Sequence, residues 1–370
     1  MQLTPTSVDG KERYDAKASF CEVDWDLQRE NPASVSFFSG LKEQSTSCDS
    51  TMHTFDLFDI VQKIRSYDAI TPNMRSIAPS GVIFHESRCG STLAANILAA
   101  SAPSKTRVYS EHYVPVDTLR ACAESSACND DLHMQLIRDV YYVLGRAPAD
   151  YGLEFVFYKS NSGGMYIDKF TSAFPDAPWA YMFRDTHEIM QSHWKVPEES
   201  MDPDAHEAKC ARLYRNPHQP EPTKAVLAKA DKQYYELSQT EYCAAHLAGI
   251  SHSVIQEHER TGKGRFINYQ QMPQVMWETL LPIDFGVEVE PYMVDNMMQF
   301  THLYAKGHQQ GRANEKWASD TSQKKNSITE NVSRAIELFC PNMYQQLERI
   351  SQKQQREPKT WMVRKEARSS

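Results

Sequence analysis

The sequence predicts an α/β domain built on a central parallel β-sheet flanked by helices. Short apolar runs alternate with helical segments from about residue 80 onwards, which is typical of parallel strands joined by crossover helices. One run, Leu153 to Lys159, is almost continuously apolar, as expected of a strand buried on both faces. Over all 370 residues, 41% are hydrophobic and 24% are charged, so the chain can form a full core.

The first strand is expected at Gly81 to His85, and it leads through a polar turn into a helix that continues over Leu93 to Ala100. We expect the second strand to lie beside the first. The second to fifth strands are expected at 107–110, 153–159, 179–183 and 265–269, and later helices at 223–260, 292–303 and 332–350. The first of these later helices should end at Thr261-Gly262, because glycine commonly follows the last helical residue.

Three regions are expected along the chain. Residues 1–76 mix short apolar patches with Ser, Asp and Lys, which indicates an N-terminal accessory region. Residues 77–350 hold the alternating pattern of the α/β domain. Residues 351–370 form a polar, basic C-terminal tail.

Charge, hydropathy and cysteine spacing exclude several classes of protein. The net charge is -8, whereas a general nucleic-acid binder is more often basic, so no nucleic-acid partner is expected. No stretch approaches the ~18 apolar residues of a membrane helix, and the N-terminus has no apolar signal core, so we expect a cytoplasmic protein without a membrane span. The eight cysteines are scattered without a CxxC pair, which predicts mostly reduced, partly buried thiols and no zinc site. The sequence does not indicate an oligomeric state.

The strand, turn and helix at residues 81–100 carry the strongest chemical signal. The turn from Glu86 to Thr92 is rich in small residues, so backbone N–H groups can converge there. The helix that follows points its positive dipole end at the same place, and together these features predict an anion site. The Walker A string G-x-x-x-x-G-K-[ST] is absent, which disfavours a nucleotide triphosphatase. An ordinary strand-to-helix turn is the alternative.

A second segment, F-R-D-x-x-E-x-x-x-S, follows the fourth expected strand. Arg184 ends that strand, and Ser192 lies eight residues on in the next helix. Both side chains could reach one phosphate beyond the carboxyl edge of the sheet, where open α/β sheets bind their ligands. The alternative is an ion pair between Arg184 and either Asp185 or Glu188.

Taken together, S-R-C-G-S-T-L and F-R-D-x-x-E-x-x-x-S resemble two motifs of the sulfotransferase superfamily, its 5′-phosphosulfate loop and its 3′-phosphate motif. Further matches follow in the family's order at Ser110-Glu111, Phe157 to Ser160, Ala173 to Trp179 and Asn268 to Pro273. The resemblance covers roughly residues 80–350, is closest to the broad bacterial-type and algal-type branch, and implies a P-loop nucleotide-binding-like fold. It also implies transfer of a sulfonate group from 3′-phosphoadenosine 5′-phosphosulfate to a hydroxyl or amine of a small-molecule or carbohydrate acceptor, without a metal.

The resemblance implies a role for each matching residue. Arg88 stands where many members carry a lysine that touches the oxygen bridging phosphate and sulfonate. Cys89, Gly90, Ser91 and Thr92 belong to the loop that would cradle the 5′-phosphate; Arg184 and Ser192 would hold the 3′-phosphate, and Tyr269 would lie near the adenine. Lys306-Gly307 is similar to a late phosphate-binding element of some members, with Lys324 and Lys325 as rivals and solvated surface as the alternative for all of them.

The general base is a point of departure from part of the family. Cytosolic members carry a catalytic histidine in a K-[ST]-H stretch, but Asn161 takes that place here. Glu111 occupies the position of the glutamate that carbohydrate-modifying members use, and a carboxylate there can accept the acceptor's proton. His85 and His112 are neighbours that could substitute. Alternatively, Glu111 pairs with Arg88 or a lysine and only orders the loop.

Two other functions stay open from the sequence. A P-loop-like small-molecule kinase would favour a Walker lysine and a metal-holding aspartate at a strand end, and neither is evident. A catalytically inactive nucleotide-binding protein of the same fold is the other. Acceptor pockets would come from the variable loops, here residues 112–150, 195–225 and 305–330.

Overall fold

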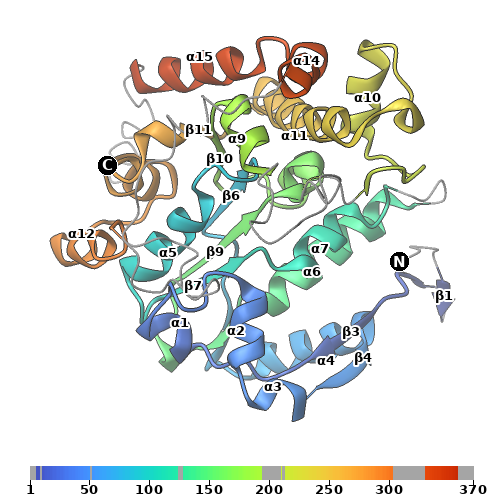
Figure 1. Ribbon diagram of the computed structural model, residues 1–370. Coiled ribbons are helices and arrows are strands. Elements are labelled where there is room, and N and C mark those ends of the chain that lie inside the picture. The colour runs from blue at the N-terminus through green and yellow to red at the C-terminus, as the bar shows by residue number, and fades with distance from the viewer. Residues whose placement is uncertain are drawn as a thin grey trace, which may run out of the picture.

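The structure is a computed structural model, and it describes residues 6–8, 11–50, 52–123, 128–193, 210, 213–302 and 330–356. Its centre is a five-stranded parallel sheet in the order β11-β10-β6-β9-β7 (Figure 1). The strands are β6 (Gly81–His85), β7 (Thr106–Ser110), β9 (Phe155–Ser160), β10 (Trp179–Phe183) and β11 (Arg265–Asn268). The predicted α/β class with a central parallel sheet is confirmed.

The expectation that the second strand lies beside the first is wrong. β9 lies between β6 and β7, and it pairs with both of them. On its other side β6 pairs with β10, with His85 opposite Met182, while Phe84 lies opposite Ser160 of β9. This register brings the carboxyl ends of the three central strands to one level, so the segments that follow them can share a site.

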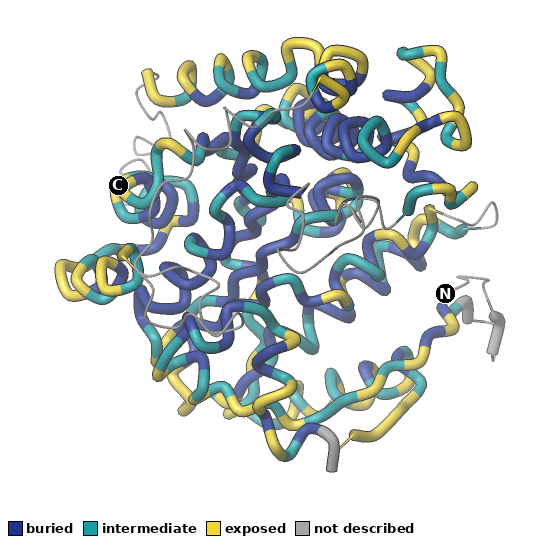
Figure 2. Tube along the Cα trace, in the orientation of Figure 1, coloured by how far each residue is buried: buried dark blue, intermediate teal, exposed yellow. Residues whose placement is uncertain are grey.

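Helices cover both faces of the sheet because alternate strand residues point to opposite sides. Val82 and Phe84 belong to the core shared with α7 (Asp130–Leu144), α8 (Ile167–Ala173), α11 (Gln239–Thr261) and α15 (Met343–Arg356). Ile83 belongs to the opposite core, shared with α5 (Ser91–Ser101), the π-helix η6 (Met276–Asp284) and α12 (Pro291–Met298). Figure 2 shows the strands buried along their length, whereas the outer turns of α12 and α15 are exposed.

Two expected long helices are each divided in the structure. The stretch expected at 223–260 forms α10 (Glu221–Lys229), the 3-10 turn η4 (Tyr234–Glu236) and α11. Ser238 begins α11 with a capping box to Glu241, which provides the helix start that the sequence pattern had obscured. The helix ends at Thr261, as predicted. Gly262 follows it with a left-handed φ of 67°.

The second divided helix comprises α14 (Glu330–Phe339) and α15, with α9 (Thr186–His193) packed beside α14. Pro341 and the left-handed Asn342 separate α14 from α15, because proline cannot continue a helix. α15 extends to Arg356, six residues into the stretch expected as a tail. α12 ends at Met298, before the expected end at 303.

The N-terminal region forms small sheets and helices along one side of the domain. Its elements are β1 (Thr6–Val8), β2 (Lys11–Arg13), β3 (Lys17–Phe20), α1 (Asp26–Glu30), α2 (Phe38–Gln44), α3 (Ser47–Ser50), β4 (His53–Asp56), α4 (Leu57–Ile70) and β5 (Met74–Ser76), which pairs with β8 (Arg146–Pro148). The Gln28 side-chain amide exchanges two hydrogen bonds of 2.9 Å with the backbone of Val108, so it covers the outer edge of β7. The boundary at residue 76 between this accessory region and the α/β domain stays a prediction.

The expectation of mostly reduced thiols is wrong. Three disulfides join Cys21 to Cys48, Cys122 to Cys128 and Cys210 to Cys243, while Cys89 and Cys340 are free and buried. Sequence spacing could not reveal these pairs, because two of them join residues 27 and 33 positions apart that meet only in the folded chain. Disulfides are uncommon in the reducing cytosol, so these three pairs argue against the expected cytoplasmic location. That location stays an untested expectation.

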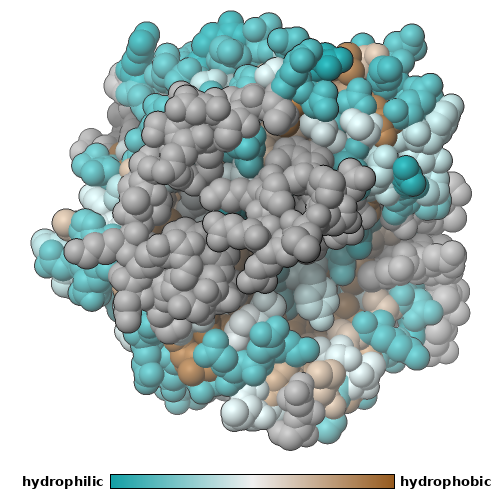
Figure 3. All heavy atoms as spheres, in the orientation of Figure 1, coloured by the Kyte–Doolittle hydropathy of each residue, from teal (hydrophilic) through white to brown (hydrophobic). Residues whose placement is uncertain are grey.

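On the face seen in Figure 3, the coloured surface is mostly hydrophilic, with small hydrophobic areas among the hydrophilic side chains. The apolar side chains of Ile70, Tyr113 and Tyr235 reach solvent from three separate elements. Among the described residues, no helix combines the length and the apolar character that crossing a membrane requires.

Candidate active site

The turn between β6 and α5 has the backbone geometry of an anion site. Arg88 and Gly90 both adopt left-handed φ values, 65° and 84°, and α5 begins at Ser91 directly afterwards. Gly90 precedes the helix without a side-chain cap. Gly90 therefore offers no side chain to the first N–H groups of α5, which carry the positive end of an eleven-residue helix.

Gly90 is required by a close approach as well as by its φ. A Cβ added at Gly90 would lie 2.6 Å from the ring of Tyr269. Tyr269 opens the short 3-10 turn η5 (Tyr269–Gln271), which directly follows β11. Tyr269 was expected near an adenine; the structure places its ring against the turn that follows β6.

The side chains of the turn are turned inward. The Cys89 thiol is fully buried and donates to the Glu86 carbonyl at 2.8 Å, and burial raises its pKa to about 12. Ser91 Oγ lies 3.1 Å from His85 Nδ1, and Thr92 is buried. Cys89 can therefore offer a ligand only its backbone N–H, and its thiol stays neutral and structural.

Arg184 follows β10 directly and is buried. Its Nε donates to the Glu188 carboxylate at 2.5 Å, and a second guanidinium nitrogen completes the ion pair. The alternative of an Arg184–Glu188 ion pair is thus present in the structure. The guanidinium also lies 4.4 Å from the centre of the Tyr269 ring. Because that ring also contacts Gly90, Tyr269 joins the two predicted phosphate motifs.

Ser192 lies on α9, one turn beyond Glu188 on the same face of the helix. Its Oγ is buried and has no hydrogen-bond partner within the described part of the chain. Arg88 Nε and Ser160 Oγ are likewise buried without a hydrogen-bond partner among the described residues. Buried polar atoms are normally paired, so three unpaired ones at or after the ends of adjacent strands are consistent with a missing polar ligand.

Glu86 links the two motifs beneath the site, and the sequence did not single it out. Its carboxylate accepts from the Arg184 backbone N–H at 3.2 Å and from Ser251 Oγ at 2.8 Å. Tyr181 Oη lies 2.9 Å from Ser251 Oγ and extends the network. Burial raises the pKa of Glu86 to about 7. The only sequence signal was a glutamate directly after the strand G-V-I-F-H.

Glu111 directly follows β7 in a left-handed conformation, with a φ of 54°. Its carboxylate oxygen lies 3.0 Å from His85 Nε2 and 3.1 Å from Lys159 Nζ, and about a third of its side chain is exposed. Burial would raise the pKa of Glu111, but the charges of Lys159 and His85 outweigh it and hold that pKa well below its ordinary range. Glu111 is therefore ionised at neutral pH.

Lys159 was not among the expected site residues, although its fully buried side chain places a charge beside Glu111. A lysine at the end of an apolar strand, in F-V-F-Y-K-S, was the available signal. Of the alternatives for Glu111, the structure shows pairing with a lysine.

His112 points away from this cluster. Its ring contacts Phe38 with centroids 3.9 Å apart, and burial lowers its pKa to about 3. His85 is held by the Glu86 carbonyl at 2.7 Å on Nδ1 and faces Glu111 with Nε2. The late lysines, Lys306, Lys324 and Lys325, lie outside the described residues.

No protein-family model matches the sequence, and no curated protein matches it either. The structure is similar to those of two bacterial sulfotransferases. One is from Alicyclobacillus acidocaldarius, with a TM-score of 0.35, 16% identity, and coverage of 64% of this chain and 97% of that chain. The other, sulfotransferase STF9 from Mycobacterium avium, has a TM-score of 0.38, 11% identity, and coverage of 78% and 84%. At TM-scores below 0.5, these similarities support neither an activity nor an acceptor for this chain.

Proposed function

We propose that the chain is a sulfotransferase that moves a sulfonate group from 3′-phosphoadenosine 5′-phosphosulfate to a hydroxyl or amine of a small-molecule or carbohydrate acceptor. The supporting observation is the convergence of two segments, some ninety residues apart, that are predicted to bind phosphate groups. Tyr269 packs against both Gly90 and Arg184, and Glu86 binds the backbone of Arg184 from below. Two phosphate-type sites at one sheet edge suit a nucleotide with phosphates at both its 5′ and 3′ positions.

The donor's 5′-phosphosulfate would lie on the N–H groups at the start of α5, beside Arg88. Its 3′-phosphate would take Ser192 Oγ and compete with Glu188 for the guanidinium of Arg184. The Tyr269 ring, already against both segments, would lie beside the nucleoside between them. The unpaired Arg88 Nε and Ser192 Oγ would gain partners in this way.

In the reaction, the acceptor oxygen attacks sulfur in line, and the bond from sulfur to the bridging oxygen breaks. The products are a sulfated acceptor and adenosine 3′,5′-bisphosphate. Negative charge grows on the leaving oxygen, where Arg88 and the α5 N–H groups would stabilise it. The acceptor's proton passes to the Glu111 carboxylate.

The low pKa of Glu111 bears on this last step. A carboxylate held ionised by Lys159 accepts a proton poorly while that lysine remains fully paired to it. A negatively charged donor bound nearby would share the lysine's charge and raise the pKa of Glu111. The base would then gain strength when the donor is present.

The first test is thermal unfolding with candidate ligands. Adenosine 3′,5′-bisphosphate should raise the melting temperature, because it offers both phosphates to the two motifs. ATP with magnesium should have a smaller effect. Stabilisation by ATP with magnesium alone would favour a kinase instead, and no effect of either ligand would favour an inactive relative of the fold.

A further inference from the structure

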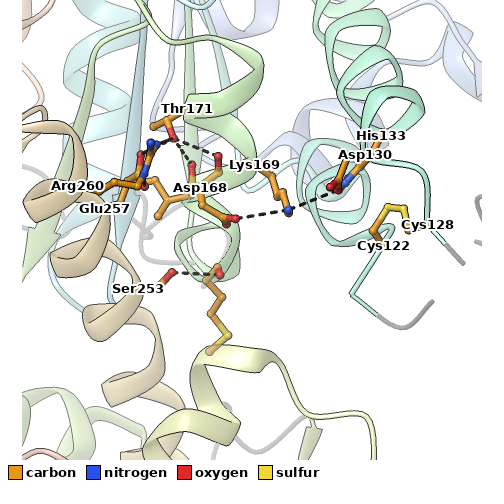
Figure 4. A network of polar contacts seen from close by, with 12 residues as sticks. Cys122, Cys128, Asp130, His133, Asp168, Lys169, Thr171, Ser253, Glu257 and Arg260 are labelled. Carbon is orange, nitrogen blue, oxygen red and sulfur yellow. Dashed lines mark hydrogen bonds and ion pairs between the residues drawn. A yellow bond between two sulfur atoms is a disulfide. The ribbon is translucent and has the colours of Figure 1, made fainter. Parts of the chain in front are cut away.

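Three metal-ligating side chains meet at the junction of α6 (Tyr113–Arg120) and α7, away from the sheet edge. They are Cys122, Cys128 and His133, and one ligand atom from each lies within 4.8 Å of the others. Figure 4 shows the two sulfur atoms bonded to each other, with His133 on the first turns of α7 beside them.

His133 is the most informative of the three. It is fully buried, and its Nε2 lies 2.8 Å from the Thr118 carbonyl oxygen. A carbonyl only accepts, so Nε2 carries the proton and Nδ1 keeps its lone pair. Nδ1 has no hydrogen-bond partner within the described residues. A histidine whose second nitrogen is held by a backbone carbonyl is oriented as a metal ligand usually is.

We propose that Cys122, Cys128 and His133 bind Zn²⁺ when the Cys122–Cys128 disulfide is reduced. Two thiolates and one imidazole are a zinc donor set that leaves a fourth position for water. Soft sulfur donors do not suit Mg²⁺ or Ca²⁺. The two thiolate charges balance the charge of the ion, so a neutral site can form beside a buried ring.

The two forms are connected by a balanced exchange. A dithiol reductant attacks the disulfide, the bond between the Cys122 and Cys128 sulfurs breaks, and the reductant becomes a cyclic disulfide. Both cysteines then carry a thiol proton. Zn²⁺ displaces these two protons to solvent as it forms two bonds to sulfur and one to His133 Nδ1.

The ion has a route to the site. Cys122, Cys128 and His133 line a cleft of ≈ 830 Å³, and both cysteines are partly exposed. Carboxylates of Asp130 and Asp168 stand on the same cleft, on either side of Lys169 (Figure 4). An approaching cation therefore meets negative charge before it reaches the sulfur atoms.

The test uses the full chain, reduced with a dithiol that is then removed by anaerobic gel filtration. Titration with Co²⁺ should give one equivalent of a tetrahedral cobalt–thiolate spectrum, which Zn²⁺ then abolishes. Cys128→Ser removes one of the two thiolates and should weaken the sulfur-to-cobalt band, and His133→Gln should weaken Co²⁺ binding at least ~10-fold. The matched control Cys21→Ser removes a thiol from another disulfide and should keep the full spectrum.

A missing band in the reduced wild-type chain, or an unchanged band in Cys128→Ser, would overturn the proposal. Because a variant can misfold, a second measurement uses wild type alone. Zn²⁺ should protect Cys122 and Cys128 from alkylation, read by mass spectrometry, while the other four disulfide-forming cysteines keep their rates. Equal alkylation of the pair with and without Zn²⁺ would also overturn it.

Discussion

At the scale of single residues, Arg184 and Glu111 carry most of the proposed chemistry, and each is already paired. Arg184 binds Glu188, and Glu111 binds Lys159. A paired side chain can serve a ligand only if the ligand competes with the partner or shares it. The effect of removing either residue therefore depends on what the partner does afterwards.

Arg184→Ala should weaken binding of adenosine 3′,5′-bisphosphate by about 1.5–3 kcal/mol, because a charge-assisted phosphate contact is lost. Glu188→Gln removes the competitor for the guanidinium and should bind at least as tightly as wild type. Arg260→Ala, which removes a solvent-exposed arginine paired to Glu257, is the control and should bind normally. Calorimetry measures all three, and unchanged affinity in Arg184→Ala would take Arg184 out of the site.

Glu111→Gln should lower turnover by ~10²–10⁴, the usual effect of removing a general base. Donor affinity should change little, since the base acts on the acceptor. His112→Ala should keep turnover, because its ring faces Phe38. Steady-state rates with a working acceptor and calorimetric donor binding are measured together. Normal turnover in Glu111→Gln with an inactive His112→Ala would make the histidine the base, and joint loss of turnover and binding would make Glu111 structural.

At the scale of elements, the turn from β6 into α5 depends on Gly90, and the strand ends depend on the buried Glu86. Both positions join segments that are distant in sequence. Each can be tested by a substitution that leaves the proposed ligand contacts in place.

Gly90→Ala should destabilise the fold more than Gly152→Ala does. Both glycines have left-handed φ values, 84° and 75°, so each alanine costs about 1–2 kcal/mol of backbone strain. Only at Gly90 does the new methyl group meet a ring, that of Tyr269, whereas nothing lies within 4 Å at Gly152. Urea unfolding gives both values, and equal losses would show that the ring moves aside freely.

Glu86 should make stability depend on pH. Its pKa rises from 4.5 in the unfolded chain to about 7 in the fold, so the folded state holds the extra proton between these values. The stabilisation is complete below pH 4.5 and is lost as pH rises through 7, with a size on the order of 3 kcal/mol.

Glu86→Gln mimics the neutral acid and should therefore gain stability relative to wild type between pH 5 and 8. The free energy of unfolding in urea, measured at pH 5 and at pH 8, checks this. Glu337→Gln, which changes an exposed glutamate, is the control. A constant difference between Glu86→Gln and wild type across this range would contradict a buried proton on Glu86.

At the scale of the whole molecule, the disulfides tie distant parts of the chain together. Six of the eight cysteines are paired, so two thiols remain free. Protein made in an oxidising compartment should show two reactive thiols when it is unfolded without reductant, and eight after reduction. A thiol titration with a chromogenic disulfide measures both numbers, and eight thiols before reduction would rule out the pairs.

Much of the sheet was predictable because each strand is a short apolar run between polar turns. β6 and β10 were expected with their observed bounds, and the other core strands agree to within two residues. The order of the strands was not predictable, because neighbours in a parallel sheet are chosen by crossovers that no local pattern records. For the same reason Lys159 was not expected beside Glu111, and the absence of CxxC spacing did not reveal that Cys122, Cys128 and His133 meet.

The central place of β6 has a consequence for how the chain is made. Every residue of this strand is buried in the finished protein, yet its first neighbour in synthesis, β9, begins 74 residues later. At 5–20 residues per second the ribosome needs roughly 4–15 s to make that interval, and longer to reach β10. During this time an apolar strand with both edges open remains without its partners on the nascent chain. Chaperone demand during translation should therefore be greatest between the synthesis of β6 and that of β10.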